Sequence, residues 1–221
     1  MKLLSAVLVI AIACLVPGLA LATDSGALYG PGPGGPPPIF DRSDGFLTTL
    51  FASDNNYAGN SFDITPNVDV NVVGFDVNLT NLGFDFTVQV WTRQGTANGF
   101  ETNPAGWSML GEVAVTPAGT DLPTYVDIGG LQIAAGETVG VIITAVEAIS
   151  GVGGFNYTNG GPTNFQNSDM VVRTYRGLAE GFPPTGTFEY RQWNGTVYYD
   201  YGQPVPVEDT TWGAIKVGYS K

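Results

Sequence analysis

Apolar and polar residues alternate along most of the chain after residue 39, and this two-residue period predicts β-strands. The alternation is clearest over residues 68–79 and 84–93. A slip at Val72-Val73-Gly74 within the first of these runs indicates a β-bulge. Residues 139–145 are almost continuously apolar, which is typical of a strand in the middle of a sheet. The same patterns predict further strands at residues 62–64, 109–115, 125–128, 170–175 and 212–219.

Turn-forming residues separate these runs about every ten residues, and short strands at this spacing predict a sandwich or a barrel. No segment after the first 22 residues has a helical period, so we predict almost no helix. Residues 94–106 and 158–168 are longer than hairpin loops, and a jelly roll accommodates such crossings between its sheets. The sequence therefore predicts an all-β, two-sheet antiparallel β-sandwich of the jelly-roll type, with an immunoglobulin-like sandwich as the alternative.

The first 22 residues have the features of a secretory signal peptide. Lys2 supplies a positive charge, residues 3–15 are apolar, and Ala20-Leu21-Ala22 offers small residues to a signal peptidase. A membrane anchor is one alternative, but the apolar run breaks at Pro17, and a span needs about 20 apolar residues. Lipidation of Cys14 is another, although the better cleavage site follows that cysteine. We expect no membrane span after signal cleavage.

The rest of the chain divides into two parts. Residues 23–38 are rich in Gly and Pro and predict an extended linker rather than a packed structure. This linker either holds the following domain away from a surface or has no task of its own. The predicted organisation is a signal peptide at 1–22, a linker at 23–38 and one β-sandwich domain at 39–221.

The composition excludes several kinds of chemistry. The chain has no histidine, and its one cysteine, Cys14, lies in the predicted signal peptide. The mature chain therefore has no histidine-dependent catalytic triad, thiolate metal site or disulfide. A formal net charge of -12 predicts repulsion from nucleic acid and anionic lipid. We expect an exported bacterial protein, secreted or at the cell surface, whose stability depends on its apolar core.

Residues 188–201 form the densest aromatic cluster, and Asn194-Gly195 within it predicts a tight hairpin turn. By analogy with sugar-binding sandwiches, an exposed aromatic face here would stack on sugar rings. The predicted ligand-binding residues are Tyr190, Arg191, Trp193 and Tyr199. The alternative is cross-strand aromatic packing, which stabilises a hairpin by about 0.2–1 kcal/mol per pair. The other tryptophans, Trp91, Trp107 and Trp212, are expected in the core or at its edge.

Residues 53–63 are rich in the side-chain oxygens that Ca²⁺ prefers. The candidate ligands of a structural Ca²⁺ are Asp54, Asn56 and Asp63. The segment lacks the order of an EF-hand loop, and Asn and Asp are also common turn formers, so turn formation is the alternative.

Several segments together resemble an uncharacterised secreted β-sandwich domain of environmental bacteria, often found in exoproteins with a PEP-CTERM-type sorting tail. The resemblance covers about residues 46–200 and is carried by residues 62–64, 74–79, 88–96, 106–111, 131–140 and 191–195. It implies an exported surface or matrix protein and carries over no catalytic residues. The segment from Val205 onward has neither the apolar span nor the basic cluster of that tail, so sorting by that route is not expected.

These observations predict a non-catalytic surface or matrix module that binds a polysaccharide or associates with its own copies. The alternative is a carbohydrate-active hydrolase or lyase, which needs two carboxylates about 5–9 Å apart. Glu112 and Glu189 are the first candidates, because they are the two glutamates expected on strands.

Overall fold

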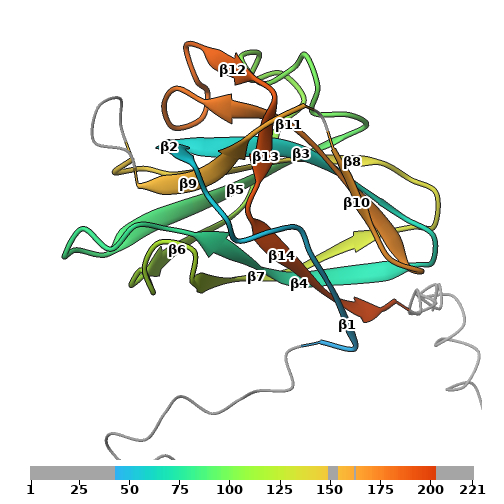
Figure 1. The fold of residues 1–221 in the computed structure, drawn as a ribbon. Helices are drawn as coiled ribbons and strands as arrows, with labels where there is room; N and C mark the ends of the chain where they lie inside the picture. Colours follow the sequence, from blue (N-terminus) through green and yellow to red (C-terminus); the bar gives the residue numbers. More distant parts are fainter. Residues whose placement is uncertain (1–42, 149–153, 162, 203–221) are drawn as a thin grey trace, which may run out of the picture. The chain divides into compact units, whose positions relative to one another are not determined.

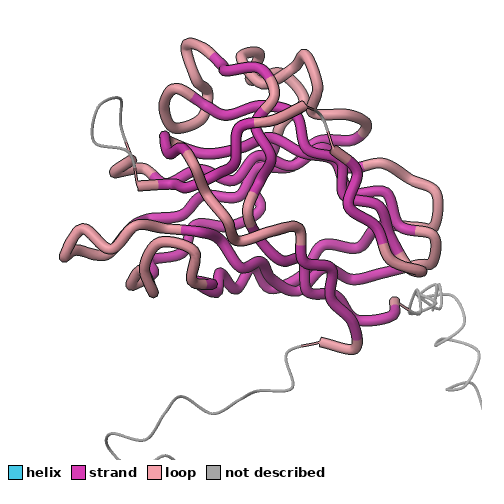
Figure 2. Tube along the Cα trace, viewed as in Figure 1, coloured by secondary structure: helices cyan, strands magenta, loops and turns pink. Residues whose placement is uncertain are grey.

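The computed structural model describes residues 43–148, 154–161 and 163–202. In these ranges it consists of strands and loops without any helix (Figure 2). The predicted signal peptide, the linker and the expected strand at 212–219 with Trp212 lie outside the described residues.

The strands form three antiparallel sheets (Figure 1). The four-stranded sheet contains, in spatial order, β1 (Gly45–Thr48), β14 (Gly195–Tyr201), β4 (Val70–Asn78) and β7 (Pro123–Ile133). The seven-stranded sheet contains β10 (Asn164–Gln166), β11 (Met170–Leu178), β3 (Gly59–Pro66), β8 (Val139–Ala145), β5 (Phe86–Gln94) and β6 (Ser108–Val115), with β12 (Thr187–Glu189) beside β11. A small third sheet contains β13 (Arg191–Trp193), β9 (Phe155–Asn159) and β2 (Asn55–Tyr57).

The two larger sheets pack their apolar faces together, which confirms the predicted β-sandwich. Alternation explains the core, because alternate residues of β5, and of β4 on either side of its bulge, point inward. All seven residues of β8 are buried between β3 and β5, as its continuous apolar sequence predicts. The predicted bulge is also present, since the pairing of β4 with β7 shifts between Val72 and Gly74.

Trp91 and Trp107 lie at the edge of the core, as expected. Both rings contact Phe182, with centroids 4.6 Å and 5.5 Å away respectively. They belong to a small apolar cluster on the outer side of the seven-stranded sheet, which also includes Ile142 and Leu178.

The structure differs from the sequence prediction at Asn194-Gly195, where no hairpin forms. β13 pairs with β9 in the small sheet, whereas β14 pairs with β1 and β4 in the four-stranded sheet. The chain therefore passes from one sheet to another at this point. Gly195 is needed there for close packing rather than for a turn, because a Cβ atom would overlap the Trp193 ring and the Asp76 carbonyl oxygen.

One long connection also differs from expectation. Residues 95–107 join β5 to β6, which are neighbours in one sheet, so this segment does not cross between sheets. It is held instead by two buried carboxylates. Asp63 Oδ1 accepts a hydrogen bond from the Ala97 amide at 2.7 Å, and Glu101 Oε1 accepts one from Ser61 Oγ at 3.0 Å. This loop also contributes Asn98 to the candidate functional site.

Candidate functional site

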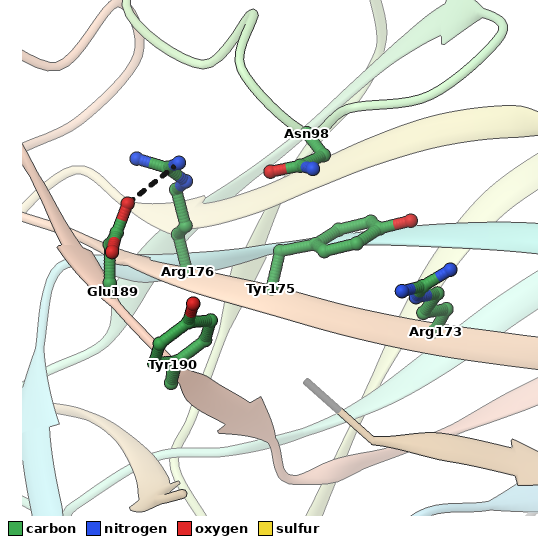
Figure 3. A pocket seen from close by; sticks show the side chains of 6 residues that line it. All are labelled: Asn98, Arg173, Tyr175, Arg176, Glu189 and Tyr190. Atoms are coloured by element: carbon green, nitrogen blue, oxygen red, sulfur yellow. Dashed lines mark ion pairs between the residues drawn. The ribbon is translucent and has the colours of Figure 1, made fainter. Parts of the chain in front are cut away.

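A pocket of about 270 Å³ lies over β11, and we call it the Tyr190 pocket (Figure 3). It is lined by Asn98, Arg173, Tyr175, Arg176, Glu189 and Tyr190. These residues come from the 95–107 loop, from β11 and from the end of β12 with the residue that follows it. The volume is near the lower limit of about 300 Å³ for small-molecule sites and suits one sugar-sized group.

A β-bulge in β11 brings two successive side chains to this pocket. The pairing of β11 with β3 shifts between Thr174 and Arg176, which leaves Tyr175 as the extra residue. In a regular strand Tyr175 and Arg176 would point to opposite faces. The bulge changes this alternation, and Figure 3 shows both side chains beside the pocket with Arg173.

Arg176 is held between two carboxylates. Its Nη2 lies 3.0 Å from Glu189 Oε1, and its Nε lies 3.6 Å from Glu101 Oε1. Glu101 is 2% exposed, and its Oε2 also accepts a hydrogen bond from the Gly99 amide at 2.9 Å. A buried carboxylate needs such partners because its desolvation is costly. The network thereby fixes the 95–107 loop, and Asn98 with it, against β11 and β12.

Tyr175 is oriented by a buried hydrogen bond. Its hydroxyl donates to Asp63 Oδ2 at 2.8 Å. Burial raises the pKa of the Tyr175 phenol, and the hydrogen bond to Asp63 acts in the same direction. The phenol is therefore protonated at neutral pH, and its ring is a fixed wall of the pocket.

Arg173 differs from the other arginines of the described residues. Its side chain is exposed, and the guanidinium carbon lies 5.5 Å from the centre of the Tyr175 ring. Within the described part of the chain it forms no ion pair or hydrogen bond. The ion pairs there belong to Arg176, and Arg93 and Arg191 donate to main-chain oxygens. The Arg173 donors are thus available to a ligand.

Tyr190 has the most unusual backbone of the site. Its φ is 57°, in the left-handed region, and its side chain is 52% exposed. A non-glycine residue rarely adopts this conformation, which costs about 1–2 kcal/mol. The Tyr190 carbonyl oxygen accepts hydrogen bonds from the Gly160 amide at 3.1 Å and from Arg191 Nη1 at 3.1 Å, and these bonds hold the turn. Such strain is concentrated at functional sites.

The four residues predicted to bind a sugar are only partly together. Tyr190 lines the pocket, whereas Arg191 does not line it and donates to the Glu189 carbonyl oxygen at 2.7 Å. Trp193, in contrast, is fully buried and stacks on Phe62 with centroids 4.2 Å apart. Its ring belongs to the sandwich core, with Phe62 and Phe75, and therefore offers no platform to a ligand.

Tyr199 is also separate from the pocket. It lies on β14 in the four-stranded sheet, is 1% exposed and donates to Asp169 Oδ2 at 2.7 Å. Its ring fills the space over Gly45, where a Cβ atom would overlap it. Of the three aromatic residues predicted to bind a sugar, Tyr190 alone is exposed at the pocket.

The three candidate Ca²⁺ ligands are not gathered into one site. Asp54 precedes β2 and accepts a hydrogen bond from the Asn159 amide at 2.7 Å, and Asn56 is exposed on β2. Asp63 lies on β3 in another sheet, and both its oxygens already accept hydrogen bonds. Across the described ranges, no cluster of three metal-ligating His, Cys, Asp or Glu side chains occurs. Most of the oxygen-rich segment lies instead on β2 and on β3, and β3 is an interior strand between β11 and β8.

Glu112 and Glu189 lie on opposite edges of the seven-stranded sheet. Glu112 is on β6 and accepts a hydrogen bond from Gln89 Nε2 at 2.7 Å, whereas Glu189 is on β12. Five strand spacings separate these strands, or about 24 Å along the sheet at about 4.8 Å each. They are too far apart to act together on one glycosidic bond.

Comparison of the sequence with protein-family models and with curated proteins gives no match. Within the described ranges, no helix is long and apolar enough to cross a membrane.

Proposed function

We propose that this chain is a non-catalytic exported surface or matrix module that binds a polysaccharide through the Tyr190 pocket. The observation that carries the proposal is Tyr190 itself, an exposed aromatic ring held in a strained backbone conformation at a pocket of sugar size. Sugar-sized ligands need an aromatic surface and a few convergent polar groups. The ring of Tyr190 supplies the first, and Asn98, Arg173 and Glu189 supply the second.

The location of the module rests on the sequence. Residues 1–22 have the pattern of a signal peptide, and the resemblance described above implies an exported surface or matrix protein. An acidic chain is also suited to remaining soluble outside the cell.

Hydrolysis by paired acids is a weaker proposal for the same pocket. Arg176 connects Glu101 with Glu189, so two carboxylates do lie near each other. However, Glu101 is buried, and its two oxygens accept hydrogen bonds from Ser61 and Gly99. It cannot reach a glycosidic bond, and Glu189 alone does not make an acid pair.

The proposal is tested by affinity electrophoresis of the full exported chain in gels that contain neutral or acidic polysaccharides. We expect retardation by at least one polysaccharide, weakened about tenfold by Tyr190→Ala, because an aromatic contact contributes about 0.5–1.5 kcal/mol beyond its buried area. Tyr201→Ala is the matched control, since Tyr201 is a similarly exposed tyrosine on the four-stranded sheet. Equal retardation of the two variants would overturn the proposed site.

A further inference from the structure

We infer that the sugar bound in the Tyr190 pocket carries a carboxylate, which Arg173 binds. The inference rests on the proposed function and specifies its ligand. Within the described residues the positive side chains are four arginines, Arg93, Arg173, Arg176 and Arg191. Two of the four line this one pocket, in a chain whose formal net charge is -12.

The two arginines of the pocket have different roles. Arg176 is neutralised by Glu189 and Glu101, so its charge serves the structure. Arg173 is exposed and lacks a carboxylate partner among the described residues. A guanidinium group presents a planar fork of donors that matches a carboxylate in two parallel hydrogen bonds.

The surrounding acids do not take up the free guanidinium. Asp63 is the acid paired across from Arg173 in the sheet, but it is 5% exposed and accepts hydrogen bonds from Tyr175 and Ala97. Glu189 lies at the other end of the pocket, against Arg176 (Figure 3). The pocket is therefore polarised, with a free cation at one end and a neutralised pair at the other.

This arrangement orients a ligand. The carboxylate of an acidic sugar would lie against Arg173, its ring against Tyr190, and its hydroxyl groups toward Asn98 and Glu189 (Figure 3). Amide and carboxylate oxygens accept hydrogen bonds from hydroxyl groups, whereas they would repel a second anionic group. The site thus fits a sugar with one negative charge.

The net charge of the protein restricts the polymer that carries this sugar. A densely charged polyanion would be repelled by a surface of net charge -12, over a distance of about 10 Å at 0.1 M salt. A polysaccharide with occasional uronic acid residues, or a terminal one, avoids most of this repulsion. The inferred ligand is therefore a sparsely carboxylated polysaccharide.

The test uses the full exported chain and measures binding of methyl glycosides of glucuronic acid and of glucose by titration NMR. We expect the acidic glycoside to bind at least tenfold more tightly than the neutral one. Arg173→Gln should remove this preference and leave the weak binding of the neutral glycoside, whereas Tyr190→Ala should weaken both. Asn81→Asp is the control, because it also lowers the net charge by one and lies in an exposed loop. An aspartate at position 81 can still accept the hydrogen bond from the Gly83 amide.

The outcomes separate the two proposals. Equal binding of both glycosides, lost in Tyr190→Ala, would overturn the carboxylate inference and keep the pocket as a sugar site. A preference for the acidic glycoside that survives in Arg173→Gln would also overturn it. If neither the glycosides nor any polysaccharide binds, the proposed function itself fails. Circular dichroism and urea unfolding establish that each variant is folded.

Discussion

The left-handed backbone of Tyr190 makes a prediction of unusual sign. Within a strand, replacement by Ala leaves a protein more stable than replacement by Gly, by about 0.5–1 kcal/mol, because Gly loses more backbone entropy on folding. At Tyr190, where φ is 57°, the order should reverse. Ala retains the strain of the left-handed conformation, which is about 1–2 kcal/mol, whereas Gly does not.

The two effects can be combined. Both variants lose the same half-buried tyrosine ring, since Tyr190 is 52% exposed, so this loss cancels in the comparison. Subtracting the entropy cost of Gly from the relief of strain leaves Tyr190→Gly more stable than Tyr190→Ala by about 0–1.5 kcal/mol, with a midpoint of about 0.75 kcal/mol. Both variants should be equally defective in sugar binding, because both lack the ring.

Urea unfolding followed by tryptophan fluorescence measures this difference directly, provided that the slope with denaturant is the same for the two variants. Tyr201 is the matched control, since it is 53% exposed and is absent from the residues with positive φ. There the Ala variant should be the more stable one. If Ala is at least as stable as Gly at position 190 also, the strain argument is refuted, and with it the reason for assigning function to this turn.

Two further predictions concern residues outside the pocket. Trp193→Phe should lower the free energy of unfolding by about 1–3 kcal/mol, because it leaves a void beside Phe62, and sugar binding should persist. A change below about 0.5 kcal/mol in urea unfolding would contradict the core position of the Trp193 ring. Burial and the hydrogen bond to Asp169 raise the pKa of Tyr199 from 10.0 to about 12, so its contribution to stability is complete below pH 10 and is lost as the pH rises toward 12. Across this pH range the free energy of unfolding, measured with urea, should therefore decline less in Tyr199→Phe than in the parent chain. Equal declines in the two proteins would argue against the buried phenol.

The sheet strands could be predicted because their signal is local. The alternation in β4 and β5 and the apolar run of β8 depend only on which face of a strand is buried, and each strand carries that information in its own residues. The bulge near Gly74 was visible for the same reason, as a break in the alternation.

The pairing of strands could not be predicted in the same way. Asn194-Gly195 has the composition of a hairpin turn, but β14 has a stronger alternative in β1 and β4, with Thr196 opposite both Thr48 and Asp76. These partners are distant in sequence, so no local pattern records them. The predicted hairpin over residues 188–201 would have placed Trp193 and Tyr199 on an exposed face, whereas the sheets bury both residues.

The pocket depends on the same long-range pairing. Arg173, Tyr175 and Arg176 stand on a strand that the alternation identifies, and the sequence does show an unusual concentration of arginine there. What the sequence does not show is the bulge at Tyr175 or the 95–107 loop that closes one side. Of the residues that line the pocket, Tyr190 was identified in advance for its aromatic neighbours and Glu189 as a candidate acid. Arg191 was identified too, but it does not line the pocket.

The site combines a rigid floor with one strained residue, and this combination bears on how it would bind. The loop is fixed by Glu101 and Asp63, both buried and both fully engaged in hydrogen bonds or ion pairs. A ligand would therefore not need to order the loop, and the entropy cost of binding would be small. The strain at Tyr190 is already present in the free protein, so the ring is held ready at the pocket instead of being moved there by the ligand. If the proposed function holds, such a site would bind a single sugar unit without first ordering its own loop or turn.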